Sequence, residues 1–154
     1  MSITIAVAAA AIAIAVTALL LFSRSVKRAR RARAEISAAL GAGKCMLYFS
    51  ATSLKLNGEA VPDSRRMTAG RQCGIVVEPG HYESVGTYVI RDDEGKLIAT
   101  FTEAELGFTL KAGREYGLGV FLFDTEILSQ AVSHRQLGPS GSGQGILALA
   151  CVAC

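Results

Sequence analysis

The feature that most constrains this chain is an uninterrupted apolar run near its beginning. Residues 3–22 contain no charged residue, glycine or proline. As a helix this run is about 30 Å long, which matches the thickness of the hydrocarbon core of a bilayer. Thr4 and Thr17 are its polar members, and a helical threonine can bond its hydroxyl to the preceding turn. The run predicts a single transmembrane anchor over residues 1–23.

A cluster of basic residues follows the apolar run directly: Arg24, Lys27, Arg28, Arg30, Arg31 and Arg33. A cleaved signal peptide carries its positive charge before the apolar run, so this order favours an uncleaved signal anchor over a cleaved signal or a buried core helix. Basic flanks remain on the cytoplasmic side of a membrane. We therefore expect a single-pass membrane protein with its N-terminus outside and its C-terminal domain in the cytoplasm, or on the equivalent side of an organelle.

The charge balance away from this cluster is mildly acidic. The chain has 16 Lys and Arg against 13 Asp and Glu, for a net charge of +3. Setting the six clustered bases aside leaves ten basic residues against 13 acidic ones. Nucleic-acid binding requires a basic face on the folded domain. We expect instead that the cluster contacts the head groups of a lipid bilayer, and that the chain binds no nucleic acid.

The middle of the chain has the pattern of short strands. Helix-forming residues continue the anchor as a basic helical stalk over residues 24–43, which glycines end near Gly41. Residues 44–124 then contain six or seven short apolar runs separated by turn signals, including the hairpin signal Asn57-Gly58. Residues 102–105 have the spacing of a capping box and predict one helical turn. This pattern predicts a small, mainly antiparallel β-sandwich or barrel.

The last part of the chain predicts a helix, a linker and an apolar tail. Residues 125–137 predict a short C-terminal helix, which Gly138-Pro139 ends. Residues 138–154 predict a flexible linker followed by the apolar tail, residues 146–154. An exposed apolar tail promotes aggregation, so we expect it to be buried on the domain, on a partner or in the membrane.

Three segments of the middle region resemble one type of small domain. They are residues 56–59 (LNGE), residues 77–82 (VEPGHY) and residues 110–116 (LKAGREY). In these segments the chain is similar to the PEGA and peptidase-regulatory-like β-sandwich domains. The resemblance implies strand–turn–strand corners with an aromatic residue pointing back into the sandwich. It also implies a non-catalytic binding or spacer module, and no functional residues carry over from it.

The cysteines offer few options for chemistry. In a cytosolic protein Cys45, Cys73, Cys151 and Cys154 should be reduced, and the first two should be buried as small apolar residues. The pair Cys151 and Cys154 has the spacing of a redox or metal motif, but a zinc site needs four ligands. The same segment has the position of a C-terminal lipidation box, which makes Cys151 a candidate lipidation site. Packing of this segment as part of the apolar tail is the simpler interpretation.

The remaining motifs do not indicate an enzyme. Residues 41–45 (GAGKC) lack the first glycine and the final Ser or Thr of a phosphate-binding loop. Residues 92–94 are acidic, which is typical of a soluble hairpin tip. His81 and His134 are the only histidines, and no set of nucleophile, base and acid can be identified. We expect no catalytic residue, no cofactor, no metal and no small-molecule substrate.

The leading functional hypothesis is a non-enzymatic single-pass membrane protein whose cytoplasmic β-domain is a protein-interaction module. One alternative is a structural accessory subunit of a larger membrane complex, whose anchor packs among other helices. Small residues such as Ala6, Ala10 and Ala13 would allow close helix contact. Another alternative is a signal-anchored protein of an organellar outer membrane. In the first two cases the expected partners are other proteins of a membrane complex.

Overall fold

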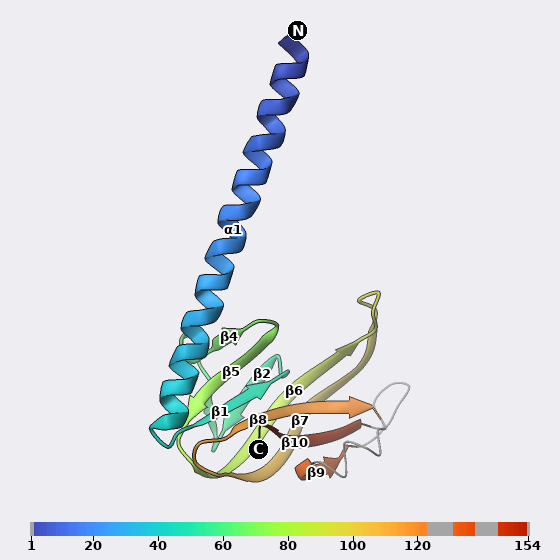
Figure 1. The fold of residues 1–154 in the computed structure, drawn as a ribbon. Coiled ribbons are helices and arrows are strands. Elements are labelled where there is room, and N and C mark those ends of the chain that lie inside the picture. The colour runs from blue at the N-terminus through green and yellow to red at the C-terminus, as the bar shows by residue number, and fades with distance from the viewer. Residues whose placement is uncertain (1, 123–130, 138–144, 154) are drawn as a thin grey trace.

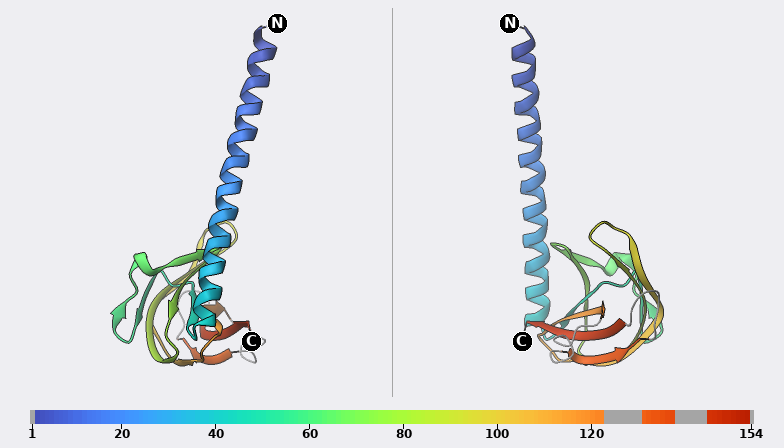
Figure 2. Two further views of the ribbon diagram at one scale, coloured as in Figure 1. Left: turned by 60° about the vertical axis from the view of Figure 1, so that its left-hand side comes forward. Right: turned by 90° about the vertical axis from the view of Figure 1, so that its right-hand side faces the viewer.

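The protein consists of a long helix and a domain of strands. The computed structural model describes residues 2–122, 131–137 and 145–153, with side chains for residues 11–121, 131–137 and 145–152. Helix α1 (Ser2–Gly41) projects far beyond the domain, and its C-terminal part lies against the strands (Figure 1; Figure 2). The helix ends at Gly41 as predicted. Gly43 then takes a φ of 84°, a backbone conformation that favours glycine after a helix end.

The transmembrane anchor predicted over residues 1–23 is corrected by the structure. Within the part of the chain that the structure describes, no helix is both long enough and apolar enough to cross a membrane. The single-pass and signal-anchor interpretations depended on that anchor and are corrected as well. The structure shows a projecting helix in its place.

The described strands form two sheets. The prediction of a mostly-sheet domain after the helix is therefore confirmed. The large sheet has the order β4-β5-β1-β8-β10-β9 and the small sheet the order β3-β2-β6-β7. The strands of the large sheet are β1 (Cys45–Phe49), β4 (Met67–Ala69), β5 (Gln72–Val77), β8 (Glu115–Leu122), β9 (Ala131–Gln136) and β10 (Gly145–Ala153). The small sheet contains β2 (Ser53–Leu56), β3 (Glu59–Ala60), β6 (Gly80–Arg91) and β7 (Leu97–Leu110), and a single 3₁₀ turn, η1 (Asp63–Arg65), precedes β4.

Strand pairing is antiparallel throughout the described sheets except between β1 and β8, which run parallel with Leu47 opposite Tyr116. The hairpin predicted at Asn57-Gly58 is confirmed, because these residues connect β2 to β3. Their φ values of 51° and 83° are those of the tight turn that the two residue types favour.

The helical turn predicted over residues 102–105 is wrong. These residues belong to β7, where the register with β6 shifts between Gly86 and Tyr88. Glu103 has a φ of 51°, so the chain makes a β-bulge there instead of a helical turn. The apolar alternation of β7 explains this outcome, since Phe101, Ala104 and Leu106 must all reach the core.

The C-terminal helix predicted over residues 125–137 is also corrected. Residues 131–136 form β9, while residues 125–130 lie outside the described residues. The predicted apolar tail forms β10, which lies between β8 and β9 and pairs with both. Local preferences favoured a helix, but the apolar strand β10 needs hydrogen-bonding partners on both sides, and β9 supplies one of them.

One hydrophobic core fills the space between the two sheets. Side chains from the inner faces of both sheets are buried together, among them Leu47, Leu54, Tyr88, Phe108 and Leu149. Tyr88 is 1 % exposed, and its hydroxyl has no hydrogen-bond partner among the residues that the structure describes. Burial raises the pKa of this hydroxyl above its usual value. The inner faces therefore form the core, and the hollow described below lies on the outer face of the large sheet.

Candidate protein-binding surface

Helix α1 covers one part of the outer face of the large sheet. Ile36 is 1 % exposed and packs with Met46 and Tyr48 of β1, and Leu40 and Met67 border this small cluster. These contacts place the helix over the edge of the sheet that contains β4, β5 and β1. Beyond β1 the sheet continues with β8 and β10, and there its outer face is hollowed.

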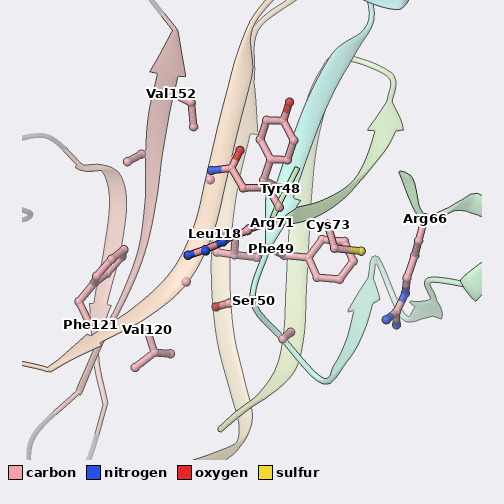
Figure 3. Close-up of a pocket in the computed structure, with 15 residues that line it drawn as sticks. Tyr48, Phe49, Ser50, Arg66, Arg71, Cys73, Leu118, Val120, Phe121 and Val152 are labelled. Carbon is pink, nitrogen blue, oxygen red and sulfur yellow. The ribbon is translucent and has the colours of Figure 1, made fainter. Parts of the chain in front are cut away.

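The hollow on this face has a volume of about 610 Å³. This size is within the range of roughly 300–1,000 Å³ that is typical of ligand pockets in proteins. Its walls are mainly apolar. Figure 3 shows Phe121 and Val152 on one side of the hollow, Arg66 on the other side, and Ser50 between them. Val152 is 50 % exposed, so apolar surface is presented directly to solvent at this place.

Two glycines of β8 form part of the lining. Gly117 and Gly119 alternate with Tyr116 and Leu118, which point into the core. Neither glycine has a positive φ, so the backbone does not require glycine at either position. A Cβ at Gly117 would meet only Val152, at 3.4 Å. Glycine weakens a strand and often marks a place where a ligand approaches the backbone closely.

Two arginines border the apolar lining. The guanidinium of Arg66 lies 5.4 Å from the centre of the Phe49 ring, and its Nε is 3.2 Å from a carboxylate oxygen of Asp63. Arg71, in the turn before β5, also lines the hollow. Among the described residues no carboxylate lies within ion-pair distance of Arg71. The hollow thus combines apolar walls with one cation that has no acidic partner there.

A second, smaller cleft lies between α1 and the turn from β4 to β5. Its volume is about 420 Å³, and its charged lining residues are Arg30 and Arg33 of the helix. Ala69, Gly70 and Gln72 form its other wall, and Gln72 also lines the hollow. The cleft and the hollow therefore adjoin at the β4–β5 turn.

A nearly buried carboxylate fixes the helix beside this cleft. Glu115 of β8 is 9 % exposed and accepts a hydrogen bond of 3.2 Å from the hydroxyl of Tyr48. The guanidinium of Arg33 is 3.7 Å from the same carboxylate oxygen. Burial, and then the negative charge of Glu115, raise the pKa of the Tyr48 hydroxyl, which keeps its proton for this bond. The three side chains connect α1 to the parallel strands β1 and β8.

The predicted interface residues are only partly brought together. All six bases are exposed on α1: Arg24, Lys27, Arg28, Arg30, Arg31 and Arg33. Arg30 and Arg33 line the cleft, whereas the other four do not line the cleft or the hollow. Cys151, the predicted lipidation site, lies half-buried on β10 against the core. Its lipidation stays a prediction.

The structure also reveals a polar cluster that the sequence did not indicate. The His81 ring lies 2.8 Å from a carboxylate oxygen of Glu83 and 3.2 Å from the hydroxyl of Thr109. The signal was present in the pattern, because residues 81 and 83 share one face of β6 and β7 places Thr109 opposite His81. The order of hydroxyl, imidazole and carboxylate resembles a catalytic triad. The three side chains of the cluster are exposed on the small sheet, and none of them lines the hollow or the cleft.

Groups that could hold a metal ion and the cysteine thiols were the other candidates for chemistry. No group of three or more His, Cys, Asp or Glu side chains in the described ranges could hold a metal ion. The thiols of Cys45 and Cys73 are free, and burial raises the pKa of the Cys45 thiol. Cys151 is disulfide-bonded, which differs from the expectation that all the cysteines are reduced.

Comparison of the chain with protein-family models, with curated proteins and with solved structures found no match. The surface must therefore be interpreted from its own geometry. The hollow was not predicted from the sequence, although glycine and apolar residues alternate in β8.

Proposed function

We propose that the chain is a non-enzymatic protein-interaction module whose binding surface is the hollow on the large sheet. The observation that carries the proposal is the pair Gly117 and Gly119, which leaves an apolar hollow next to exposed Val152. A few anchoring side chains in desolvated pockets supply most of the energy of a protein interface. A hollow of this kind is suited to receive such an anchor.

The test is a selection of binders from a random peptide library displayed on phage, with the full chain immobilised. Binders are then measured on the wild type, on Gly119→Leu and on Thr109→Leu. The first variant fills the hollow. The second places the same side chain, leucine, on the exposed face of the small sheet and serves as the control.

The expected result is that binders lose about tenfold or more in affinity on Gly119→Leu and keep their affinity on Thr109→Leu. Circular dichroism and thermal unfolding establish that both variants are folded. A selection that yields no binder, or binders that Gly119→Leu does not weaken, contradicts the proposal.

A specific observation favours a second candidate function, that of an accessory subunit in a larger protein assembly. Seven large apolar side chains of α1 are at least half exposed: Ile12, Ile14, Val16, Leu19, Leu20, Leu21 and Phe22. A helix that is apolar all round is normally buried among other elements. On this proposal the projecting part of α1 packs among helices of partner proteins.

Native size in the source cell tests this second function. Polar substitution of Leu19, Leu20 and Phe22 should release the chain from a large complex and leave the domain folded. Sedimentation of the unaltered chain as a lone monomer would contradict the accessory role without affecting the hollow.

A further inference from the structure

We propose that the partner segment is a short acidic and apolar peptide, which places an apolar side chain in the hollow and a carboxylate on the basic cleft. This inference rests on the proposed function, because it names the chemistry of the partner at the same surface. The two depressions are continuous, their charged residues are all arginines, and two of these arginines have no acidic partner among the described residues.

The hollow and the cleft form one surface around the β4–β5 turn. Gln72 lines both, with Arg71 on the side of the hollow and Gly70 on the side of the cleft. An extended peptide rises about 3.3 Å per residue, so a few residues can reach from one depression to the other. A partner that uses both depressions would thus be a chain segment.

The charges along this surface have one sign. The charged residues that line the two depressions are Arg66 and Arg71 in the hollow and Arg30 and Arg33 in the cleft. No acidic side chain lines either of them. Complementary charge steers association and excludes partners of like charge. The surface therefore favours carboxylates in the partner.

Two of these four arginines are available for a partner. The guanidinium of Arg66 lies 3.2 Å from the carboxylate of Asp63, and that of Arg33 lies 3.7 Å from the carboxylate of Glu115. Arg30 and Arg71 have no carboxylate within ion-pair distance among the described residues, and both are exposed. Arginine binds carboxylates with two parallel hydrogen bonds, which adds orientation to the attraction. Arg71 and Arg30 are the side chains that would bind the acidic groups.

A second copy of this chain fits the surface poorly. Among the described residues, the exposed apolar segment that a second copy could offer is part of α1, residues 11–22, and the six bases between Arg24 and Arg33 follow it. A partner segment beside these bases has the same charge as Arg71 and Arg30, and like charges repel. A nucleic acid matches the charge of this surface but not the mainly apolar walls of the hollow, because it presents a phosphate backbone.

Fluorescence anisotropy with the full chain tests the inference. The probe is a short labelled peptide of Leu and Phe alternating with Asp and Glu. One control peptide carries Asn and Gln in place of the acids, and another keeps the acids but carries Ser in place of Leu and Phe. A single-stranded oligonucleotide and vesicles of anionic lipid serve as competitors.

The acidic–apolar peptide should bind most tightly. Arg71→Gln and Arg30→Gln should each weaken it about threefold to tenfold and leave the amide peptide unchanged. Raising the ionic strength from about 0.05 to about 0.5 M should remove the preference for acids. Gly119→Leu should abolish binding of both apolar peptides, whereas Thr109→Leu should not.

The possible failures are distinguishable. If the amide peptide binds as well as the acidic one and Arg71→Gln has no effect, the acidic partner is wrong while the protein-interaction module stands. If no peptide binding depends on Gly119, the proposed function itself fails. Tighter binding to the oligonucleotide or to the vesicles overturns the assignment to a peptide. Unchanged circular dichroism of each variant excludes unfolding as the cause.

Discussion

Two glycines on the outer face of the large sheet have opposite surroundings. A Cβ at Gly74 would lie 2.5 Å from the carbonyl oxygen of Leu47 and 2.7 Å from the end of the Met46 side chain. A Cβ at Gly117 would meet only Val152, at 3.4 Å. The first glycine is thus required by packing, because backbone atoms cannot yield, and the second is not.

Gly74→Ala should therefore destabilise the domain, by about 1–3 kcal/mol in the free energy of unfolding. Gly117→Ala should change that free energy by no more than about 0.5–1 kcal/mol, and in the stabilising direction, since alanine restricts the unfolded chain. Urea unfolding followed by circular dichroism compares the two. Equal destabilisation by both would mean that Gly117 is a packing residue.

Tyr88 predicts a pH dependence of stability. Its pKa is raised by burial in the folded protein, so the unfolded chain releases the proton first as the pH rises above about 10. The contribution of Tyr88 to the free energy of unfolding is fully present below that pH. It is lost as the pH rises towards the pKa of the folded protein. Tyr88→Phe should flatten this alkaline loss and should change the free energy of unfolding at neutral pH by about 1 kcal/mol or less, because the hydroxyl has no partner in the described part of the chain. Urea unfolding at a series of pH values measures both effects, and an unaltered alkaline slope in Tyr88→Phe would contradict the interpretation.

Strand β10 is the element whose position differs most from expectation. It lies between β8 and β9, and Leu147 and Leu149 are fully buried in the core. Leu149→Ala should cost about 2–5 kcal/mol, as a buried leucine does when it leaves a cavity. Val152→Ala, at the exposed end of the same strand, is the control and should change the free energy of unfolding, measured with urea, by no more than about 0.5 kcal/mol. Equal effects would show that β10 does not belong to the core.

Local signals predicted local structure well. Asn57-Gly58 specifies its turn without help from the rest of the fold, and the helix end at Gly41 needs only the glycines after it. The parallel pairing of β1 with β8 joins segments far apart in the chain, and no local pattern encodes it. The strand β9 was not predicted for the same reason, because it forms through its pairing with β10 and not through a local pattern.

The candidate surface was beyond the reach of the sequence for a similar reason. Gly119, Val152 and Arg71 come from three separated segments, and only the sheet order brings them to one hollow. The cluster of bases was visible in the sequence, but the structure decides which of them face a cleft. Helical geometry places Arg30 and Arg33, three residues apart, on the face of α1 that lines the cleft.

For the whole molecule, α1 divides into a part that supports the domain and a part that does not. Every described side chain of residues 11–22 is exposed, whereas Ile36 is buried against β1. Removing residues 1–22 should leave the unfolding temperature of the domain unchanged. Removing residues 1–40 should lower it by several degrees, because Met46 and Tyr48 lose their cover. Differential scanning calorimetry compares the two deletions, and equal unfolding temperatures would show that the helix does not support the sheet.

The place of β10 inside the large sheet has a consequence for biosynthesis. A ribosome adds roughly 5–20 residues each second, and β8 is complete well before residues 145–153 are made. Until then β8 has an unpaired edge, which is a template for aggregation. The domain cannot close before residues 145–153 are made, and a chain interrupted before Gly145 keeps that edge open. Chaperones and proteases that recognise open edges can therefore distinguish a chain that contains β10 from one that lacks it.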